Sequence, residues 1–274
     1  IIPTKDKKDV LNTCLNSLYN NTNYSNYEVI VVDNNSQEPE TFALLNDYKN
    51  KYKNFKVLRL ECEFNYSYLN DEAVKNATGE YIVLLNNDTE VISPNWLSEM
   101  VGYAMHNHVG CVGAKLLYPN QTIQHAGVVV GVGGIAMHAF VSTGRNQYGY
   151  FGRLVSVYDY SCVTAACLMI KKSKYLEVNG LDEKLKVAYN DVDLNLKLLE
   201  KGYNNVVLPH VELFHYESLS RGNDMSSSQI KRFKEETDYM CDKWKDKLLT
   251  DKFYNDNFSY NYAFRLDRRN EHDK

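Results

Sequence analysis

The sequence lacks the features that mark several common protein classes. No apolar run approaches the ~20 residues that cross a bilayer, and no charged, apolar and small-residue leader opens the chain. Neither charge sign dominates, because 31 basic residues stand against 35 acidic ones and the formal net charge is −4. Without a basic surplus there is no long-range attraction for a polyanion. We therefore expect a soluble protein with no nucleic-acid partner.

Motifs for zinc binding, redox chemistry and nucleophilic hydrolysis are also missing. No C-x-x-C spacing and no G-x-S-x-G elbow occurs, and no cysteine has an identifiable histidine partner. The cluster at 131–134 is not a phosphate-binding fingerprint, because it does not open a helix after a first strand. We expect free, buried thiols in a reducing compartment, at the following cysteines: Cys14, Cys62, Cys111, Cys162, Cys167 and Cys241.

What is present is a regular alternation of apolar strands and amphipathic helices, in 274 residues that are 44% hydrophobic. Short apolar runs predict strands, and 3.6-residue periodicity predicts helices between them. Asp6 is expected to cap the first helix. The expected strands are 1–2, 28–33, 55–60, 81–85 and 110–117, and the expected helices are 10–18, 39–48, 69–77 and 93–104. Near-continuous apolar strands indicate an α/β fold with a mostly parallel central sheet flanked by helices.

The second half of the chain is less regular. Seven glycines between 118 and 160 predict long loops around a cleft. We expect a strand at 161–170, helices at 173–180 and 191–202, and an extended segment at 206–215. A mostly helical apolar stripe follows from Ile230 to Leu248, and Ile1-Ile2 resembles the end of a truncated strand within a longer polypeptide.

Polar residues follow several of the predicted strands, at Thr4, Asp33 and Asn86–Asp88. Ligands bind beyond the carboxyl ends of the strands in such sheets. A carboxylate there, Asp88, can hold a hard divalent cation against phosphate oxygens, although a solvated turn or helix cap is the ordinary alternative.

Two later segments carry further candidates. Asp191 opens a predicted helix, where it is either an ordinary cap or a general base beside an acceptor hydroxyl. His215 ends an extended segment and could complete a coordination shell with Asp88, against the plainer reading of a hydrogen-bonded structural histidine. His125 and His138 flank the Gly-rich region and remain weaker candidates.

In five ordered blocks, the sequence resembles the inverting family 2 glycosyltransferases of the GT-A fold, especially bacterial enzymes that build O-antigen and related surface polysaccharides. The resemblance runs from Ile1 to about Gly222. Its blocks are Ile1–Asp6, Val31–Ser36, Gly79–Val91, Gly180–Asp193, and His215 with Ser218, Ser220 and Arg221.

The resemblance implies roles for individual residues. Asp88 is the second position of the family's Asp-x-Asp motif and inherits a Mg²⁺ or Mn²⁺ ligand role, with His215 as a further ligand. Asn86 stands where the family has the first Asp and can still contact the nucleotide. Asp191 inherits the general-base role. Donor contacts are implied at Pro3, Thr4, Asp6, Asp33, Asn70, Asn86, Asn87 and Arg221, and acceptor contacts at Asn190 and Asp193.

The implied organisation is a GT-A catalytic domain at 1–222 and a helical C-terminal extension at 223–274. The implied donor is a nucleotide-diphospho-sugar and the implied acceptor a glycan or a lipid-linked saccharide. A cytoplasmic location follows, with peripheral association at the inner face of the plasma membrane and with other domains of a longer polypeptide.

Two other functions fit parts of the pattern. A sugar nucleotidyltransferase also uses a parallel sheet and a metal, but it normally has a Gly- and Arg/Lys-rich loop after the first strand, where this chain has Pro3–Asp6. A non-catalytic carbohydrate-binding domain could keep the fold without activity. Asp88, Asp191 and His215 together favour the enzyme.

Overall fold

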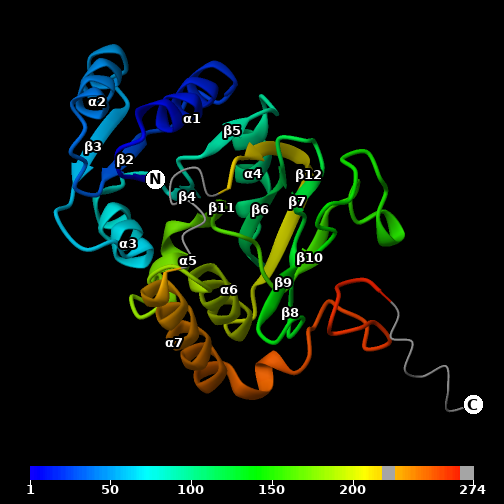
Figure 1. Cartoon of the computed structure of the whole chain (residues 1–274). Coiled ribbons are helices and arrows are strands. Elements are labelled where there is room, and N and C mark those ends of the chain that lie inside the picture. The colour runs from blue at the N-terminus through cyan, green and yellow to red at the C-terminus, as the bar shows by residue number, and fades with distance from the viewer. Residues whose placement is uncertain (218–225, 266–274) are drawn as a thin grey trace, which may run out of the picture.

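The computed structural model describes residues 1–217 and 226–265, and its centre is a sheet flanked by helices (Figure 1). Three parallel strands are ordered β1-β2-β3, and a second set is ordered β10-β12-β6-β11-β4. β5 adds to β12, β7 adds to β6, and β8 pairs with β9. The bounds are β1 (Ile2–Thr4), β2 (Val29–Asp33), β3 (Phe55–Arg59), β4 (Tyr81–Leu85), β5 (Thr89–Val91), β6 (Val109–Leu117), β7 (Ile123–His125), β8 (Val128–Val130), β9 (Ala136–His138), β10 (Tyr158–Tyr160), β11 (Cys167–Lys171) and β12 (Asn204–His215).

Two backbone hydrogen bonds join the two sets of strands. The Ile1 nitrogen donates to the Val83 oxygen at 2.8 Å, and the Leu85 nitrogen donates to the Ile1 oxygen at 3.0 Å. In parallel pairing, one residue bonds through its nitrogen and its oxygen to two residues of the next strand that are two positions apart, as Ile1 does here with Val83 and Leu85. β1 therefore lies beside β4, and the carboxyl ends of β1, β2 and β4 lie on one edge.

Helices cover both faces of the sheet because alternate strand residues point to opposite sides. In β2, Val29 and Val31 join one apolar cluster while Ile30 and Val32 join the other. The first cluster contains apolar residues of α1, α2 and α4, and the second contains those of α3, α5 and α6. The helix bounds are α1 (Lys8–Asn20), α2 (Pro39–Lys51), α3 (Tyr66–Asn76), α4 (Trp96–Ala104), α5 (Lys172–Glu177), α6 (Asn190–Glu200) and α7 (Ser227–Trp244), with 3₁₀ turns η1 (Tyr150–Gly152) and η2 (Lys245–Leu248).

The predicted α/β fold class is confirmed, and the sheet is mixed. β11 runs antiparallel to both β4 and β6, whereas β12 runs parallel to β6. The region 118–160 is not all loop, since it contains β7 to β10.

The strand predicted at 161–170 is shorter, because side chains of α6 bind the backbone of its first half. Asn195 Oδ1 accepts from the Val163 nitrogen, and Asp191 Oδ2 accepts from the Ala165 nitrogen. Backbone groups used in this way cannot join a ladder, and β11 starts at Cys167.

The predicted cap of α1 is wrong. Asp6 has a positive φ of 52° and its Oδ1 accepts from the backbone nitrogens of Gln37 and Glu38 at 2.7 and 2.9 Å. The Asp6 carboxylate therefore fixes the turn before α2. Lys7, also at positive φ, precedes α1 without a side-chain cap.

The predicted C-terminal helix is present as α7, which lies beside α5 and α6 in Figure 1. Its apolar stripe is only partly buried. Met240, Trp244 and Leu248 pack with Val192 and Leu196 of α6, but Ile230 and Phe233 are about half exposed. No helix in the described residues is long and apolar enough to cross a membrane.

Lys243 is the ionic link between α7 and the rest of the fold. Its Nζ lies 2.7 Å from Asp182 Oδ2 and 2.6 Å from Asp193 Oδ1, and Asp193 is fully buried. Trp244 Nε1 donates to the same Asp193 oxygen at 2.9 Å. Burial by itself would raise the pKa of Asp182, but hydrogen bonds from Lys243 and Tyr239 lower this pKa to about 2.

The substitution Lys243→Met should destabilise the protein by about 1–3 kcal/mol, because a buried carboxylate loses one of its cation partners. Urea unfolding at pH 7 measures this change. The control is Lys247→Met, whose ion pair with Glu200 is more than half exposed on both sides and should contribute about 0.5 kcal/mol or less. Equal effects of the two substitutions would contradict the stabilising role of Lys243 beside the buried carboxylate.

The ion pair between Lys243 and Asp182 predicts a pH dependence. The folded pKa of Asp182 is below the unfolded value of about 3.9, so its stabilisation is present above about pH 4 and is lost as pH falls towards about 2. The stability difference between wild type and Lys243→Met should therefore shrink between pH 5 and pH 3. A difference that stays constant over this range would argue against the Asp182 contribution.

Candidate active site

A cleft of about 500 Å³ opens beyond the carboxyl end of β4. Its walls come from the turn after β4, from β7 and β9, from the segment before β11, and from the first turns of α6 and α7. The polar side chains that line it include Asn86, Asp88, Gln124, His138, Asn190, Asp191, His215, Glu217, Gln229 and Arg232.

Strand register brings Asp88 and His215 together. β5 pairs antiparallel with the end of β12, with His215 opposite Thr89, and the Tyr216 nitrogen donates to the Asp88 oxygen at 2.9 Å. The side chains then meet, with His215 Nε2 3.1 Å from Asp88 Oδ1. Both residues are less than 10% exposed.

The contact between Asp88 and His215 fits a divalent cation. Adjacent ligands of an octahedral ion at about 2.1 Å lie roughly 3 Å apart, close to the 3.1 Å between Asp88 Oδ1 and His215 Nε2. The described residues contain no group of three or more His, Cys, Asp or Glu side chains arranged for a metal. An ion held by two protein ligands would take its remaining ligands from water and phosphate, as Mg²⁺ commonly does.

Asn86 completes this corner of the cleft. Its Nδ2 lies 3.3 Å from His215 Nε2, and its backbone nitrogen donates to the Ala166 oxygen at 3.0 Å. The amide therefore contacts the same imidazole nitrogen that faces Asp88.

Asp191 and Asn190 lie on another wall, at the start of α6. Asp191 Oδ2 accepts from the Ala165 nitrogen at 3.0 Å, and Oδ1 accepts from the Val192 nitrogen at 2.8 Å. Asn190 Nδ2 donates to the Val187 oxygen at 3.1 Å. The carboxylate is held in one orientation and lines the cleft together with Asp88 and His215.

Asp193, predicted as an acceptor contact, lies elsewhere. Asp193 comes two residues after Asp191 in α6. It is fully buried and is bound by Lys197, Lys243 and Trp244. A helix turns by about 100° per residue, so positions 191 and 193 cannot share one face. In this structure the Asp193 carboxylate anchors α7 and is not part of the cleft.

The predicted nucleotide contacts on the first strands lie at the expected sheet edge but do not line the cleft. Thr4 is opposite Asp33 in the β1–β2 ladder, and Asn87 Nδ2 donates to Thr4 Oγ1 at 2.9 Å. Pro3 is buried beside them. Asp33 is buried and bound to Arg59 at 2.5 Å and to the Ser36 nitrogen at 2.9 Å. The Thr4 hydroxyl and the Asp33 carboxylate are therefore each already bound to another group of the protein.

Three further predicted contacts have different outcomes. Asn70 is fully buried in α3, where its Nδ2 donates to the Tyr66 oxygen at 2.8 Å, so it does not reach a surface site. Asp6 binds the turn before α2, as described above. Arg221 lies outside the described residues.

Several cleft residues were not predicted. Gln124 contacts His215 Nδ1 at 2.6 Å, and Glu217 accepts from Gln124 Nε2 at 3.1 Å. Gln229 and Arg232 reach the cleft from α7, a region where the sequence pattern indicated only a helix. A spacing of three residues on one helix face was the available signal, but nothing in the sequence says which face meets the cleft.

The weaker histidine candidates separate. His138 lines the cleft, with Nδ1 3.2 Å from the Gln124 backbone oxygen, and burial lowers its pKa. His125 is fully buried, its ring 4.9 Å from that of His138, and burial lowers its pKa well below the ordinary value. His125 is therefore a neutral core residue.

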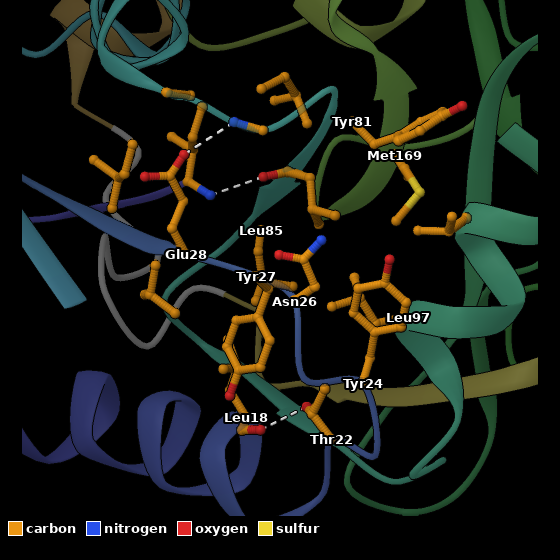
Figure 2. A pocket seen from close by; sticks show the side chains of 18 of the residues that line it. Leu18, Thr22, Tyr24, Asn26, Tyr27, Glu28, Tyr81, Leu85, Leu97 and Met169 are labelled. Carbon is orange, nitrogen blue, oxygen red and sulfur yellow. Dashed lines mark hydrogen bonds between the residues drawn. The ribbon is translucent and has the colours of Figure 1, made fainter. Parts of the chain in front are cut away.

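A second cavity, of about 470 Å³, is lined by residues at the start of β2 and β4, and Figure 2 shows it from close by. Tyr24, Leu97 and Met169 line it, and the Glu28 carboxylate at its rim binds Lys56, Thr78 and Gly79. It lies between the first residues of β2 and β4, because β1 covers only the last three residues of β2. This is the amino end of the strands, where ligands of such sheets do not bind.

Comparison with known proteins agrees with the resemblance. Residues 1–175 match the family model described as Glycosyl transferase family 2. The chain is 47% identical over 260 residues to an uncharacterized protein of Sinorhizobium fredii, covering 94% of this chain and 29% of that protein. It is 40% identical over 227 residues to the O-antigen biosynthesis protein RfbC of Myxococcus xanthus, covering 82% of this chain and 18% of that protein. The chain thus spans less than a third of these relatives.

Solved structures share the fold at low identity. GalNAc-T7 with UDP, GalNAc and Mn²⁺ has a TM-score of 0.72 at 15% identity, covering 90% of this chain and 48% of that chain. TarS 1-349 of S. aureus in complex with UDP has a TM-score of 0.57 at 18% identity, covering 79% of this chain and 59% of that chain. With a family model over more than half its length and these neighbours, the chain belongs to glycosyl transferase family 2 and has the GT-A fold.

Proposed function

We propose that this chain is the catalytic domain of an inverting, metal-dependent glycosyltransferase that moves a sugar from a nucleotide-diphospho-sugar to a hydroxyl of a glycan or lipid-linked acceptor. The observation that carries the proposal is the meeting of Asp88, His215 and Asp191 in one cleft. The two solved neighbours named above contain UDP, and one contains Mn²⁺. The name of the Myxococcus relative supports surface polysaccharide synthesis.

The charges in the cleft favour a cation beside the donor. Among the described residues that line the cleft, Asp88, Asp191 and Glu217 are carboxylates and Arg232 is the one arginine or lysine. A diphosphate meets repulsion from the carboxylates unless positive charge lies between them. Asp88 and His215 would hold a Mg²⁺ or Mn²⁺ ion, which would supply that charge beside the leaving diphosphate.

Asp191 is the proposed general base. Its two backbone hydrogen bonds fix the carboxylate in place, and Asn190 beside it lines the same wall. In a single displacement, the acceptor oxygen gives its proton to Asp191 as it attacks the anomeric carbon opposite the nucleotide, and inversion follows. No covalent intermediate on the protein is needed.

The proposed location is the cytoplasm, at the inner face of the plasma membrane, where a nucleotide donor and a lipid-linked acceptor meet. The free thiols agree with a reducing compartment: within the described residues, all six cysteines are free and four are buried. The nucleotide base, sugar and acceptor can be sought by a thermal-shift screen of nucleotide-sugars with Mn²⁺, because a ligand that binds the native state raises its stability.

Asp191→Asn and Asp88→Ala should fail in different ways. Loss of the base should lower turnover by about 10²–10⁴-fold while donor binding survives. Loss of the metal ligand should lower both donor affinity and turnover. Calorimetry with the donor and Mn²⁺, beside a transfer assay, separates the two outcomes.

The control for this pair is Asp238→Asn on the exposed face of α7, which should leave both measurements unchanged. Near-normal transfer by Asp191→Asn would show that the base is another group. Donor hydrolysis by the wild type would separately exclude a purely carbohydrate-binding domain.

Metal removal tests the role of Asp88 and His215 directly. EDTA should abolish transfer, and added Mn²⁺ or Mg²⁺ should restore it. Undiminished turnover in chelator would refute metal dependence.

Arg232 is proposed to contact the donor's phosphates. Its Nε is buried without a hydrogen-bond partner among the described residues, and the side chain lines the cleft. Arg232→Gln should weaken donor binding by about 10–100-fold, since a hydrogen bond to a charged group contributes about 1.5–3 kcal/mol. The matched control is Lys231→Gln, one residue earlier, where the cation is exposed and pairs loosely with Glu235. Equal donor affinities of the two variants would remove Arg232 from the site.

A further inference from the structure

A buried glutamine connects His215 to the wall of the cleft. Gln124 is 5% exposed, and its Oε1 lies 2.6 Å from His215 Nδ1. Its Nε2 donates to Glu217 Oε2 at 3.1 Å and to the His215 backbone oxygen at 3.5 Å. Both polar atoms of the Gln124 side chain thus bind either His215 or Glu217.

A bulge in β7 directs this side chain. Leu116 pairs with His125, and the next residue of β6, Leu117, pairs with Ile123, so Gln124 is the extra residue between two paired positions. Bulges occur next to active sites, where they redirect one side chain out of the ordinary alternation. The Gln124 backbone oxygen is also held, 3.2 Å from His138 Nδ1.

The donors and acceptors around Gln124 permit one assignment. A backbone carbonyl only accepts hydrogen bonds, and an ionised Glu217 does the same, so the end of the amide that faces them must be the NH₂ group. The other end is then the carbonyl oxygen, which also only accepts. His215 Nδ1 must therefore carry the hydrogen in the short contact with Gln124.

The tautomer of His215 determines what the cleft offers to a ligand. With the hydrogen on Nδ1, Nε2 of the neutral ring presents its lone pair. That lone pair faces Asn86 Nδ2 at 3.3 Å and Asp88 Oδ1 at 3.1 Å. A lone pair and a carboxylate oxygen at this separation repel each other unless a cation lies between them.

We propose that Gln124 is a positioning residue that holds His215 in its Nδ1–H tautomer, so that Nε2 and Asp88 together present a preformed pair of ligands to a divalent cation. The cation half of this statement rests on the metal-dependent function proposed above. The tautomer half rests on the hydrogen bonds of Gln124 alone. Partners that fix the tautomer of a ligating histidine typically change metal affinity by about 10–100-fold.

Nitrogen NMR of the metal-free full chain labelled with ¹⁵N-histidine tests the tautomer. The spectrum is recorded at a pH where the ring is neutral, and the His215 signals are identified by their loss in His215→Ala. We expect the Nδ1–H tautomer in the wild type. In Gln124→Met, which keeps the length of the side chain but removes its amide, the Nε2–H tautomer should become populated. A wild-type spectrum of the Nε2–H tautomer would overturn the proposal whether or not Gln124→Met folds.

Mn²⁺ binding, followed by the loss of the free-ion electron paramagnetic resonance signal with and without inorganic pyrophosphate, tests the consequence. Gln124→Met should bind Mn²⁺ about 10–100-fold more weakly than wild type. The control Gln147→Met, at an exposed position outside the cleft, should match wild type in both measurements. Unchanged tautomer and unchanged affinity in Gln124→Met would refute the positioning role. A wild type that shows the Nδ1–H tautomer but binds no Mn²⁺ would refute the metal function while leaving the role of Gln124 in fixing the ring intact.

Discussion

The antiparallel pairing of β5 with the end of β12 is the contact on which the cleft depends. Asn86 and His215 are 129 positions apart in the chain, and this short ladder brings their side chains to 3.3 Å. It also sets Asp88 against the same imidazole nitrogen. β12 is held in turn by its long parallel pairing with β6, so the geometry at His215 derives from the centre of the sheet. Rigid strands suit a site whose ligands must be placed within fractions of an ångström.

The second wall depends on polar side chains that replace a ladder. The backbone before β11 is bound by Asp191 and Asn195 of α6, which end the strand early and hold the helix against it. The same hydrogen bonds orient the Asp191 carboxylate towards the cleft. A shortened strand and a positioned carboxylate are therefore two results of one set of contacts.

The C-terminal helix is part of the site as well as of the fold. Lys243 and Trp244 bind the buried Asp193, and this anchor sets the position of α7 along α6. Gln229 and Arg232, at the other end of α7, then line the cleft. Asp193, which was expected to contact an acceptor, thus helps to place Arg232 in the cleft. The predicted division of the chain at residue 222 stays a prediction, and the helix beyond it takes part in the cleft.

The sequence by itself determined the α/β fold, the order of its main elements and the edge of the sheet at which polar groups gather, because these follow from local periodicity and from the residues that end each strand. It also marked Asp88, Asp191 and His215, which stand at the ends of regular elements. Only the tertiary structure decided that Asp193 faces inward, that Asp33 is bound to Arg59, and that Gln124 and Arg232 enter the cleft. Helix rotation, a one-residue bulge and the docking of α7 set these outcomes, and each depends on contacts between residues far apart in the chain, which no local pattern records.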